Sequence, residues 1–188
     1  MKHINTFISF INESTTQEVL DFCKNHKITP DEFSGKEKIE GNLILMRLET
    51  IPQGFSPQVG GDLNLRSLKT IPQGFSLTVG GSLDLSDLKT IPQGFSPHVG
   101  RDLYLDGLKT TPQGFSPHVG RNLYLDGLEN IPQWFSPHVG GDLYLSRLEA
   151  IPNGTGFNKV KGEIWVTYDG NLIDLDTLAK SIEWIEIK

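Results

Sequence analysis

Apolar side chains recur along most of this chain with a period of 20 residues, which does not drift between residues 43 and 151. In the plainest copy of the repeat the apolar positions are Leu63, Leu65, Leu68, Ile71, Phe75 and Val79. The first spacing, of two residues, is typical of a short strand whose paired leucines face inward while the residue between them faces outward. The pattern therefore predicts one coil per repeat, with stacked coils that share one continuous apolar core.

The remainder of each repeat leaves no room for a helix of useful length. Pro72 and Gly74 recur in register, and most copies carry a second proline, such as Pro57 or Pro97. Two prolines and several glycines favour an extended or polyproline-like return segment with tight turns. The predicted fold is a mainly β repeat solenoid of about seven coils, with a parallel sheet and extended returns.

The N-terminal residues, 1–38, predict a small helical cap rather than a coil. Residues 2–12 place their apolar side chains on one helical face, and residues 15–18 form a capping box that opens a helix running to about Asn25. A third helix signal begins at Thr29, with proline next and two acids in the first turn, and is expected to end near Gly35.

The solenoid itself is expected to span residues 39–168, with residues 162–166 as its seventh strand. Residues 169–188 then form a C-terminal cap within the same structural domain. A turn at Asp169-Gly170, a helix from Asp174 to Ser181 and a strand over residues 184–187 are predicted for this cap, which would protect the edge of the last coil.

The pattern Leu-x-Leu-x-x-Leu-x-x-Ile-Pro resembles the bacterial leucine-rich repeats of the short, 20-residue type, and is also similar to repeat proteins of bacteriophage and prophage genomes. The resemblance covers residues 39–168 and implies a solenoid that binds a protein, for example a small inhibitor or modulator of a host protein. One position departs from the family, because leucine replaces the usual ladder asparagine at Leu48, Leu68, Leu88, Leu108, Leu128 and Leu148. The coil is therefore expected to be flatter than the usual horseshoe.

Charge and composition narrow the classes of partner. The formal net charge of −6, from 17 basic and 23 acidic side chains, disfavours direct binding to nucleic acid and favours a basic protein surface. Cys23 is the only cysteine, so neither an intramolecular disulfide nor a Cys-rich zinc site is predicted, and this thiol is expected to be a small buried apolar group. No stretch suits a signal peptide or a membrane span, so the expected location is the cytoplasm.

The outward position between the paired leucines changes along the chain and defines the candidate site. Its series is Ile44, Asn64, Asp84, Tyr104, Tyr124, Tyr144 and Trp165. Since neighbouring strands lie ~4.8 Å apart, the last four side chains should form an aromatic stripe. The carboxylates expected to flank this stripe are Asp102, Asp106, Asp126 and Asp142. Exposed tyrosine and tryptophan are typical anchors of protein interfaces, although stacking alone would also stabilise the sheet by ~0.2–1 kcal/mol per pair.

Other positions form ladders whose expected roles are mostly structural. His98, His118 and His138 follow one another at the repeat spacing, where a metal site or pH sensitivity is an alternative to solvent exposure in a turn. Amide and serine ladders are expected to hydrogen-bond between coils. Trp134 replaces a glycine and is expected either to pack against residues 153–160 or to mark a contact surface.

Repetition argues against an enzyme, because a catalytic site needs one asymmetric set of groups and every polar group here has near-identical neighbours. No cofactor and no metal is predicted. The favoured hypothesis is a non-catalytic module that binds a partner protein through the outward sheet face. Two alternatives are an acidic mimic of nucleic acid that fills a basic groove, and a structural protein that self-assembles into homo-oligomers.

Overall fold

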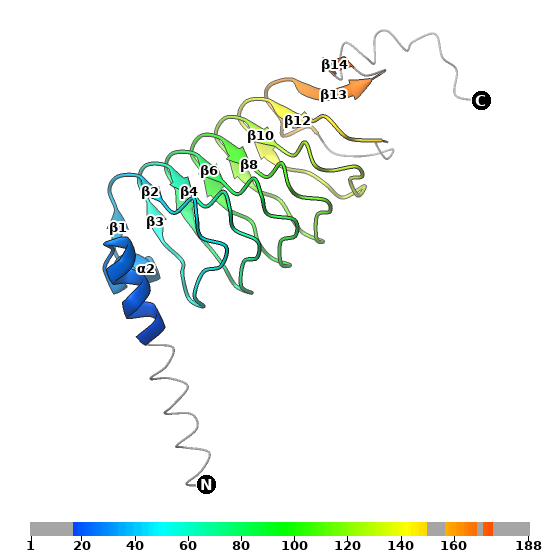
Figure 1. Cartoon of the computed structure of the whole chain (residues 1–188). Helices are drawn as coiled ribbons and strands as arrows, with labels where there is room; N and C mark the ends of the chain where they lie inside the picture. The colour runs from blue at the N-terminus through cyan, green and yellow to red at the C-terminus, as the bar shows by residue number, and fades with distance from the viewer. Residues whose placement is uncertain (1–16, 150–156, 169–170, 175–188) are drawn as a thin grey trace, which may run out of the picture.

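The computed structural model describes residues 17–149, 157–168 and 171–174, and these residues form a regular stack of coils with helices at one end (Figure 1). The helices are residues 17–26 and α2 (Pro30–Ser34). The first, larger sheet contains the Leu-x-Leu positions. Its strands are β2 (Leu43–Ile44), β4 (Leu63–Asn64), β6 (Leu83–Asp84), β8 (Leu103–Tyr104), β10 (Leu123–Tyr124), β12 (Leu143–Leu145), β13 (Ile164–Tyr168) and β14 (Asn171–Asp174).

A second sheet runs along the return side, within the segments that were predicted to be extended or polyproline-like. Its strands are β1 (Lys38–Ile39), β3 (Gln58–Val59), β5 (Thr78–Val79), β7 (His98–Val99), β9 (His118–Val119) and β11 (His138–Val139). Every neighbouring pair in this small sheet is parallel, as are the pairs of the large sheet from β2 to β13. The chain is thus a parallel β-solenoid of about six coils, bounded by the seven strands β2 to β13, close to the predicted number.

The core contains only apolar side chains among the residues that the structure describes. Leu65 and Leu68 are fully enclosed, and the equivalent leucines of the next three coils are as well. Leu68 is the last residue of a tight turn, which its backbone amide closes by donating to the carbonyl oxygen of Leu65 at 3.0 Å. Apolar packing, rather than a ladder of polar side chains, therefore fills the coil at this position.

The small sheet adds a seventh inward position that the apolar spacing did not include. Pro57, Leu77, Pro97, Pro117 and Pro137 are all buried at this position. In the copy with leucine, Leu77 and Val79 point inward on either side of the exposed Thr78, which is the alternation of a strand. The prolines are tolerated because each stands just before its strand, where no ladder hydrogen bond from its nitrogen is needed.

Two glycine positions set the shape of the coil. Gly94 lies in the left-handed region with φ 83°, at the third position of the turn that the Phe95 amide closes onto Pro92 O at 3.3 Å. Gly100 lies at the corner between the two sheets, where an added Cβ would overlap the carbonyl oxygen of Gly80 in the preceding coil. The corner therefore requires glycine because the backbones of successive coils approach closely.

The N-terminal cap has the predicted helix start. Thr29 and Glu32 form a capping box, and Gly35 ends α2 in the left-handed conformation with φ 75°. The rings of Phe22 and Phe33 each lie 5.3 Å from the ring of Phe55, centroid to centroid. Phe55 is the first ring of a row of phenylalanines, one from each coil, and Phe22 and Phe33 cover it. Apolar packing therefore closes this end of the solenoid. The predicted helix over 2–12 and the first two residues of the capping box, 15 and 16, lie outside the described residues, whereas the helix predicted to run to about Asn25 is present over residues 17–26.

The C-terminal end is closed by a strand that the sequence did not suggest. Residues 164–168 form the expected last parallel strand, and β14 pairs antiparallel with it from Trp165↔Asp174 to Tyr168↔Asn171. Asp174, expected to begin a helix, is the last residue of β14. The turn at 169–170, the rest of the helix to 181 and the strand over 184–187 lie outside the described residues. One face of the last coil is covered by the ring of Phe157, which meets Phe135 edge-on at 6.5 Å.

The corner glycine gives a first test of the close approach between coils. Replacing Gly100 by Ala should destabilise the fold by about 2–3 kcal/mol, because the added methyl group forces adjacent coils apart. Replacing Gly94 by Ala, where no atom lies within 4 Å of the added Cβ, should cost only about 1 kcal/mol of backbone strain. Urea unfolding followed by circular dichroism measures both; equal losses would contradict the close approach at the corner.

Thr111 gives a second test, because it stands where the other described copies carry isoleucine. Its hydroxyl oxygen is buried without a hydrogen-bond partner among the described residues. An unsatisfied buried hydroxyl costs on the order of 1–3 kcal/mol. Thr111→Ile should therefore stabilise the protein by about 1 kcal/mol in the same unfolding experiment, whereas Ile91→Thr, the reverse change one coil earlier, should destabilise it.

Candidate interaction surface

The aromatic stripe, which consists of Tyr104, Tyr124, Tyr144 and Trp165, forms as the sequence predicts on the outward face of the large sheet. The ring centroids of the successive tyrosines lie 4.7 and 4.6 Å apart, and their planes are within 10° of parallel. Trp165 extends the stack, with its ring 6.4 Å from that of Tyr144. All four side chains are half-buried, since each ring covers much of its neighbour's faces. The stripe thus presents ring edges and hydroxyl groups to solvent, rather than the fully exposed rings that an interface anchor suggests.

The phenol groups at the two ends of the tyrosine stack remain protonated far above neutral pH. Burial raises the pKa of Tyr104, and the carboxylate of Asp102 raises it further. The same two causes, burial and the neighbouring Asp142, raise the pKa of Tyr144. The hydroxyl row therefore offers hydrogen-bond donors beside carboxylate acceptors.

Two of the four predicted aspartates belong to a structural ladder that connects neighbouring coils. In this Asx ladder each side-chain oxygen accepts a hydrogen bond from a backbone amide of the next coil. Its members are Asn42, Asp62, Asp102, Asn122 and Asp142, with N–O distances of 2.7 to 3.1 Å. Asp102 has both oxygens engaged in the fold, because its second oxygen accepts from the Ser82 hydroxyl at 3.4 Å. Asp142 accepts through one oxygen, from the amide of Glu163. Sequence reasoning missed this ladder, although the recurrence of Asn or Asp just before the first strand leucine was its signal.

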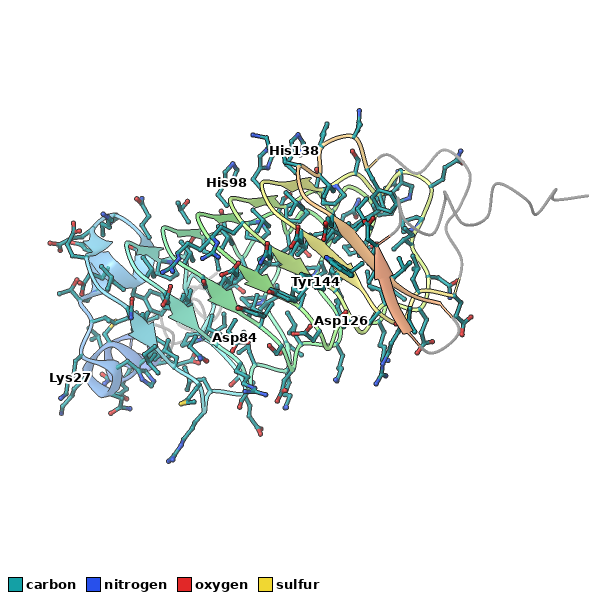
Figure 2. All side chains as sticks on the ribbon, turned by 90° about the horizontal axis from the view of Figure 1, so that it is seen from above. Lys27, Asp84, His98, Asp126, His138 and Tyr144 are labelled. Carbon is teal, nitrogen blue, oxygen red and sulfur yellow. The ribbon has the colours of Figure 1, made fainter. Side chains whose placement is uncertain are left out.

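Asp106 and Asp126 form a second pair of carboxylates on the other flank of the stripe. Partial burial raises the pKa of Asp106, and the neighbouring Asp126 raises it further. Asp126 accepts hydrogen bonds from Ser146, from the backbone nitrogen at 3.0 Å and from the hydroxyl group. The structure therefore brings all eight predicted site residues onto one face, where Tyr144 and Asp126 can be followed in Figure 2.

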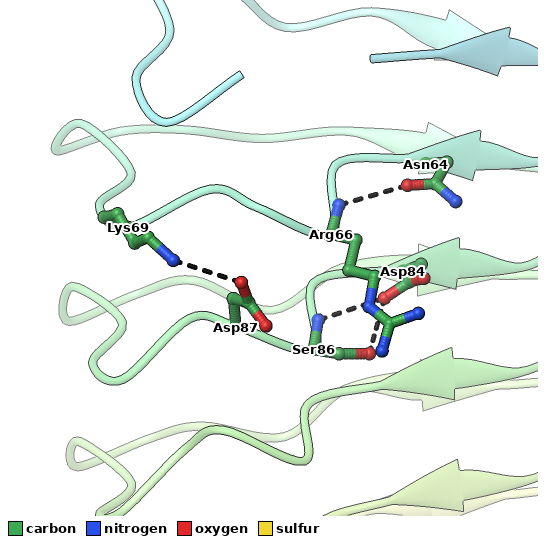
Figure 3. Close-up of polar contacts among 6 residues, drawn as sticks. All are labelled: Asn64, Arg66, Lys69, Asp84, Ser86 and Asp87. Carbon is green, nitrogen blue, oxygen red and sulfur yellow. Dashed lines mark hydrogen bonds and ion pairs between the residues drawn. The ribbon is translucent and has the colours of Figure 1, made fainter. Parts of the chain in front are cut away.

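The same face is different in the first coils, where no aromatic ring is present. Asn64 accepts from the Arg66 amide at 3.1 Å, and Asp84 accepts from the Ser86 amide at 3.0 Å. The Arg66 side chain extends toward the coil that holds Asp84 and Ser86, as Figure 3 shows. A hydrogen bond of 3.0 Å from Lys69 lowers the pKa of Asp87. The turns of both halves thus hold an ion pair, Lys69–Asp87 in the first coils and Lys109–Glu129 in the aromatic coils. The carboxylates beside the stripe, those of Asp102, Asp106, Asp126 and Asp142, form no ion pair with a described basic side chain.

The histidine ladder (His98, His118, His138) stands on strands of the small sheet, so its predicted position in a turn is wrong. His98 and His138 lie along one edge of the view in Figure 2, away from Tyr144. The imidazole centroids are 4.6 and 4.2 Å apart with planes within 12° of parallel. In stacked parallel rings the nitrogen lone pairs do not converge on one point, and no group of three or more His, Cys, Asp or Glu side chains in the described residues could hold a metal ion.

The remaining ladders have the structural role that was expected of them. The side-chain amide of Gln73 donates to the backbone carbonyl oxygen of Gln93 in the next coil at 3.3 Å. The hydroxyl of Ser96 donates to the backbone carbonyl oxygen of Ser116 at 2.7 Å. Cys23 is a buried free thiol, and burial raises its pKa. Trp134 is 42 % exposed on the return side; most of the loop expected to cover it lies outside the described residues.

The fold and these ladders define a class, the parallel β-solenoid built from coils of about 20 residues. Comparison with models of protein families, with curated proteins and with solved structures finds no match to this chain. Within the described residues, no helix combines the length and apolarity needed to cross a membrane.

Asp106 provides a test of the electrostatics of this surface. A carboxyl group whose folded-state pKa is raised makes its full contribution to stability below its unfolded pKa of ~3.9. That contribution is lost as the pH rises through the folded-state pKa. Asp106→Asn should therefore stabilise the protein at pH 7, by no more than about 1 kcal/mol because solvent screens a half-exposed group, which is ~2–4 °C in Tm. The gain should vanish at about pH 4.

Asp87→Asn is the matched control for Asp106→Asn. The pKa of Asp87 is lowered, so its carboxylate stabilises the fold above its unfolded pKa and this substitution should lower the Tm at pH 7. Thermal unfolding at pH 4 and pH 7 measures both variants. A lower Tm for Asp106→Asn at pH 7 would contradict the raised pKa of that carboxyl group.

Proposed function

We propose that this protein is a non-catalytic binding module whose large-sheet face docks onto a partner protein through the aromatic stripe. The observation that carries the proposal is the change of one repeated position, from Ile44, Asn64 and Asp84 to three stacked tyrosines and a tryptophan. The first three positions of this series indicate that the coil does not need aromatic rings there. The rings therefore stand at a position that the fold leaves free to vary.

The chemistry of the face favours a partner that presents arginine or lysine. Hydroxyl donors and the carboxylates of Asp106 and Asp126 lie within the same short segment of the sheet, and no basic side chain in the described residues pairs with these carboxylates. An arginine side chain can bridge carboxylates with its planar fork and also contact aromatic rings. Rows of such acceptors repeated at the ~4.8 Å spacing of strands would select an extended basic surface.

A mimic of nucleic acid is less well supported by the charge density of this face. Its acidic side chains from β4 to β13 are Asp62, Asp84, Asp102, Asp106, Asp126, Asp142 and Glu163. At ~4.8 Å between strands they supply roughly one charge per 3–4 Å, about half the density of duplex DNA, which carries one per ~1.7 Å. Arg66 reduces the negative charge in the first coils further. We therefore favour recognition by aromatic and hydroxyl groups, with the carboxylates in a supporting role.

Self-assembly through the ends of the solenoid is also less well supported. The N-terminal helices cover the first coil with Phe22 and Phe33, and β14 pairs with the last strand of the large sheet. Although β2 and β14 are the outer strands of the large sheet, the antiparallel direction of β14 does not continue the parallel pairing by which coils stack. Self-association through the faces of the solenoid is the remaining form of homo-oligomer. Light scattering on the purified chain would detect it as a mass above that of the monomer.

The stripe is tested by affinity capture from a lysate of the source organism or its host with a triple variant, Tyr104→Ala, Tyr124→Ala and Tyr144→Ala. Recovery of the partner should fall by about tenfold or more, because buried aromatic anchors each contribute more than ~1 kcal/mol at interfaces. A second variant with phenylalanine at the same three positions separates the hydroxyl groups from the rings.

Ile44→Ala is the matched control, since Ile44 occupies the same strand position in the first coil and is 56 % exposed. Circular dichroism checks that each variant is folded, because loss of the stack removes ~0.2–1 kcal/mol per ring pair. Unchanged recovery with the folded triple variant would refute the stripe as the interface. If raising the salt concentration from about 50 to 300 mM abolishes recovery of the partner, and the substitutions do not change that recovery, the acidic mimic is favoured instead.

A further inference from the structure

The small sheet carries a groove on its outward side, away from the aromatic stripe. The groove has a volume of about 770 Å³ and runs from Thr78 across the histidine ladder to a wall made by Asn158, Lys159 and Lys161. Its floor is smooth because the corner glycines, such as Gly100 and Gly120, contribute no side chain. A volume of this size is typical of sites that enclose a ligand of several residues or one small molecule.

The wall of the groove is fixed by backbone hydrogen bonds. The amide of Val139 donates to the carbonyl oxygen of Lys159 at 3.0 Å, and the amide of Lys161 donates to that of Val139 at 2.9 Å. The two ammonium groups are thereby attached to the end of the small sheet next to His138. Beside this wall the imidazole Nδ1 of His138 is buried without a hydrogen-bond partner among the described residues.

Positive charge is separated from negative charge around the coil. In five copies, from β3 to β11, the 11 residues that lead into and form the small sheet contain no Asp or Glu. These are residues 51–61, 71–81, 91–101, 111–121 and 131–141, and residues 157–162 contain none either. The acidic side chains of these coils belong to the large sheet and the turns that follow it. Arg101, Arg121, Lys159 and Lys161 form no ion pair with any described residue.

We propose that this groove binds an extended acidic peptide segment of a partner, whose carboxylates are held by the histidine ladder and by Lys159 and Lys161. The three imidazoles span 8.8 Å, the sum of their spacings of 4.6 and 4.2 Å. With the lysine wall beyond them they match about four to six residues of extended chain, at ~3.3 Å per residue. Stacked imidazoles expose their edges, and edge nitrogens hydrogen-bond to carboxylate oxygens.

An acidic peptide fits this site better than nucleic acid does. Single-stranded nucleic acid is held by aromatic faces on which its bases stack, whereas the faces of these imidazoles are covered by one another. The large sheet of the same molecule is acidic and would repel a long polyanion. A short acidic segment meets only the cationic side of the coil.

Binding at this groove depends on pH through the imidazoles. The groups that face them are Thr78 on β5, the neighbouring imidazoles on β7, β9 and β11, and Asn158, Lys159 and Lys161 beyond β11. Partial burial lowers the pKa of His138, and Lys159 and His118 lower it further. A bound carboxylate favours the imidazolium form, so the complex takes up protons and becomes tighter as the pH falls through ~6.5, the usual pKa of an imidazole.

Fluorescence anisotropy of a labelled eight-residue peptide of alternating Asp and Ala, in about 150 mM salt, tests the proposal. The Kd for the full chain should be several-fold lower at pH 5.5 than at pH 7.5, because a bound carboxylate favours the imidazolium form of the ladder. Lys159→Ala with Lys161→Ala should weaken binding at both pH values. His98→Gln, His118→Gln and His138→Gln together should remove most of the pH dependence, and glutamine is tolerated here because Gln58 occupies the equivalent position.

Matched controls separate binding in the groove from binding elsewhere on the molecule. The same peptide with Asn in place of Asp should not bind, and Lys89→Ala, an exposed lysine away from the groove, should leave the Kd unchanged. The triple tyrosine variant should bind the acidic peptide normally, so failure here and failure of the aromatic stripe are distinguishable. Absence of binding at pH 5.5, equal binding of the Asn peptide, tighter binding of an eight-nucleotide single strand, or a dimer at pH 5.5 by light scattering would each overturn the proposal.

Discussion

Backbone hydrogen bonds between successive coils are the interaction on which this structure depends, and they are made twice per turn of the chain. The amide of Leu63 donates to Ser82 O at 2.9 Å in the large sheet, and the amide of Gly80 donates to Val59 O at 2.8 Å in the small sheet. Both ladders have to keep the same register, because a slip of one residue would turn every inward side chain outward. This double constraint explains why the period stays at 20 residues until the last coil.

The fixed register also explains why polar groups occur as ladders. A side chain on one coil lies directly beside its copy on the next, so Asp62 can reach the amide of Ser82, and the Asx ladder extends the pairing of the large sheet by a side-chain bond on each coil. The same register places like charges side by side, so that burial raises the pKa of Asp106 and the neighbouring Asp126 raises it further. Aromatic rings and neutral imidazoles stack without that cost. The fold therefore favours their accumulation wherever the position faces outward.

The coil, the large sheet and the aromatic stripe could be predicted from the sequence. An integer period places Tyr104, Tyr124 and Tyr144 side by side whatever the shape of the return segment. The sequence was not sufficient for the small sheet, since Pro57 and its copies suggest a polyproline-like chain and each strand is only two residues long; Leu77 was the one signal of an inward strand position. The groove depends on the segment from 157 to 161, where the repeat is irregular and no periodic argument applies. Half-burial of the stripe could not be predicted either, because it results from the rings covering each other.

Tyrosine and histidine make geometrically similar stacks on the two sheets, but the chemistry of the two stacks differs. Burial and nearby carboxylates raise the pKa of Tyr104 and Tyr144, so the stripe keeps its hydroxyl donors across the physiological range. Imidazoles ordinarily change charge within that range, and protonation of this ladder would place like charges 4.2 to 4.6 Å apart between ring centroids. Such a stack is stable while it is neutral, and becomes favourable as a cation only when an anion lies against it. One repeat can thus build a pH-insensitive surface on one sheet and a pH-responsive surface on the other, because the inward side chains that hold the coils together are shared by both.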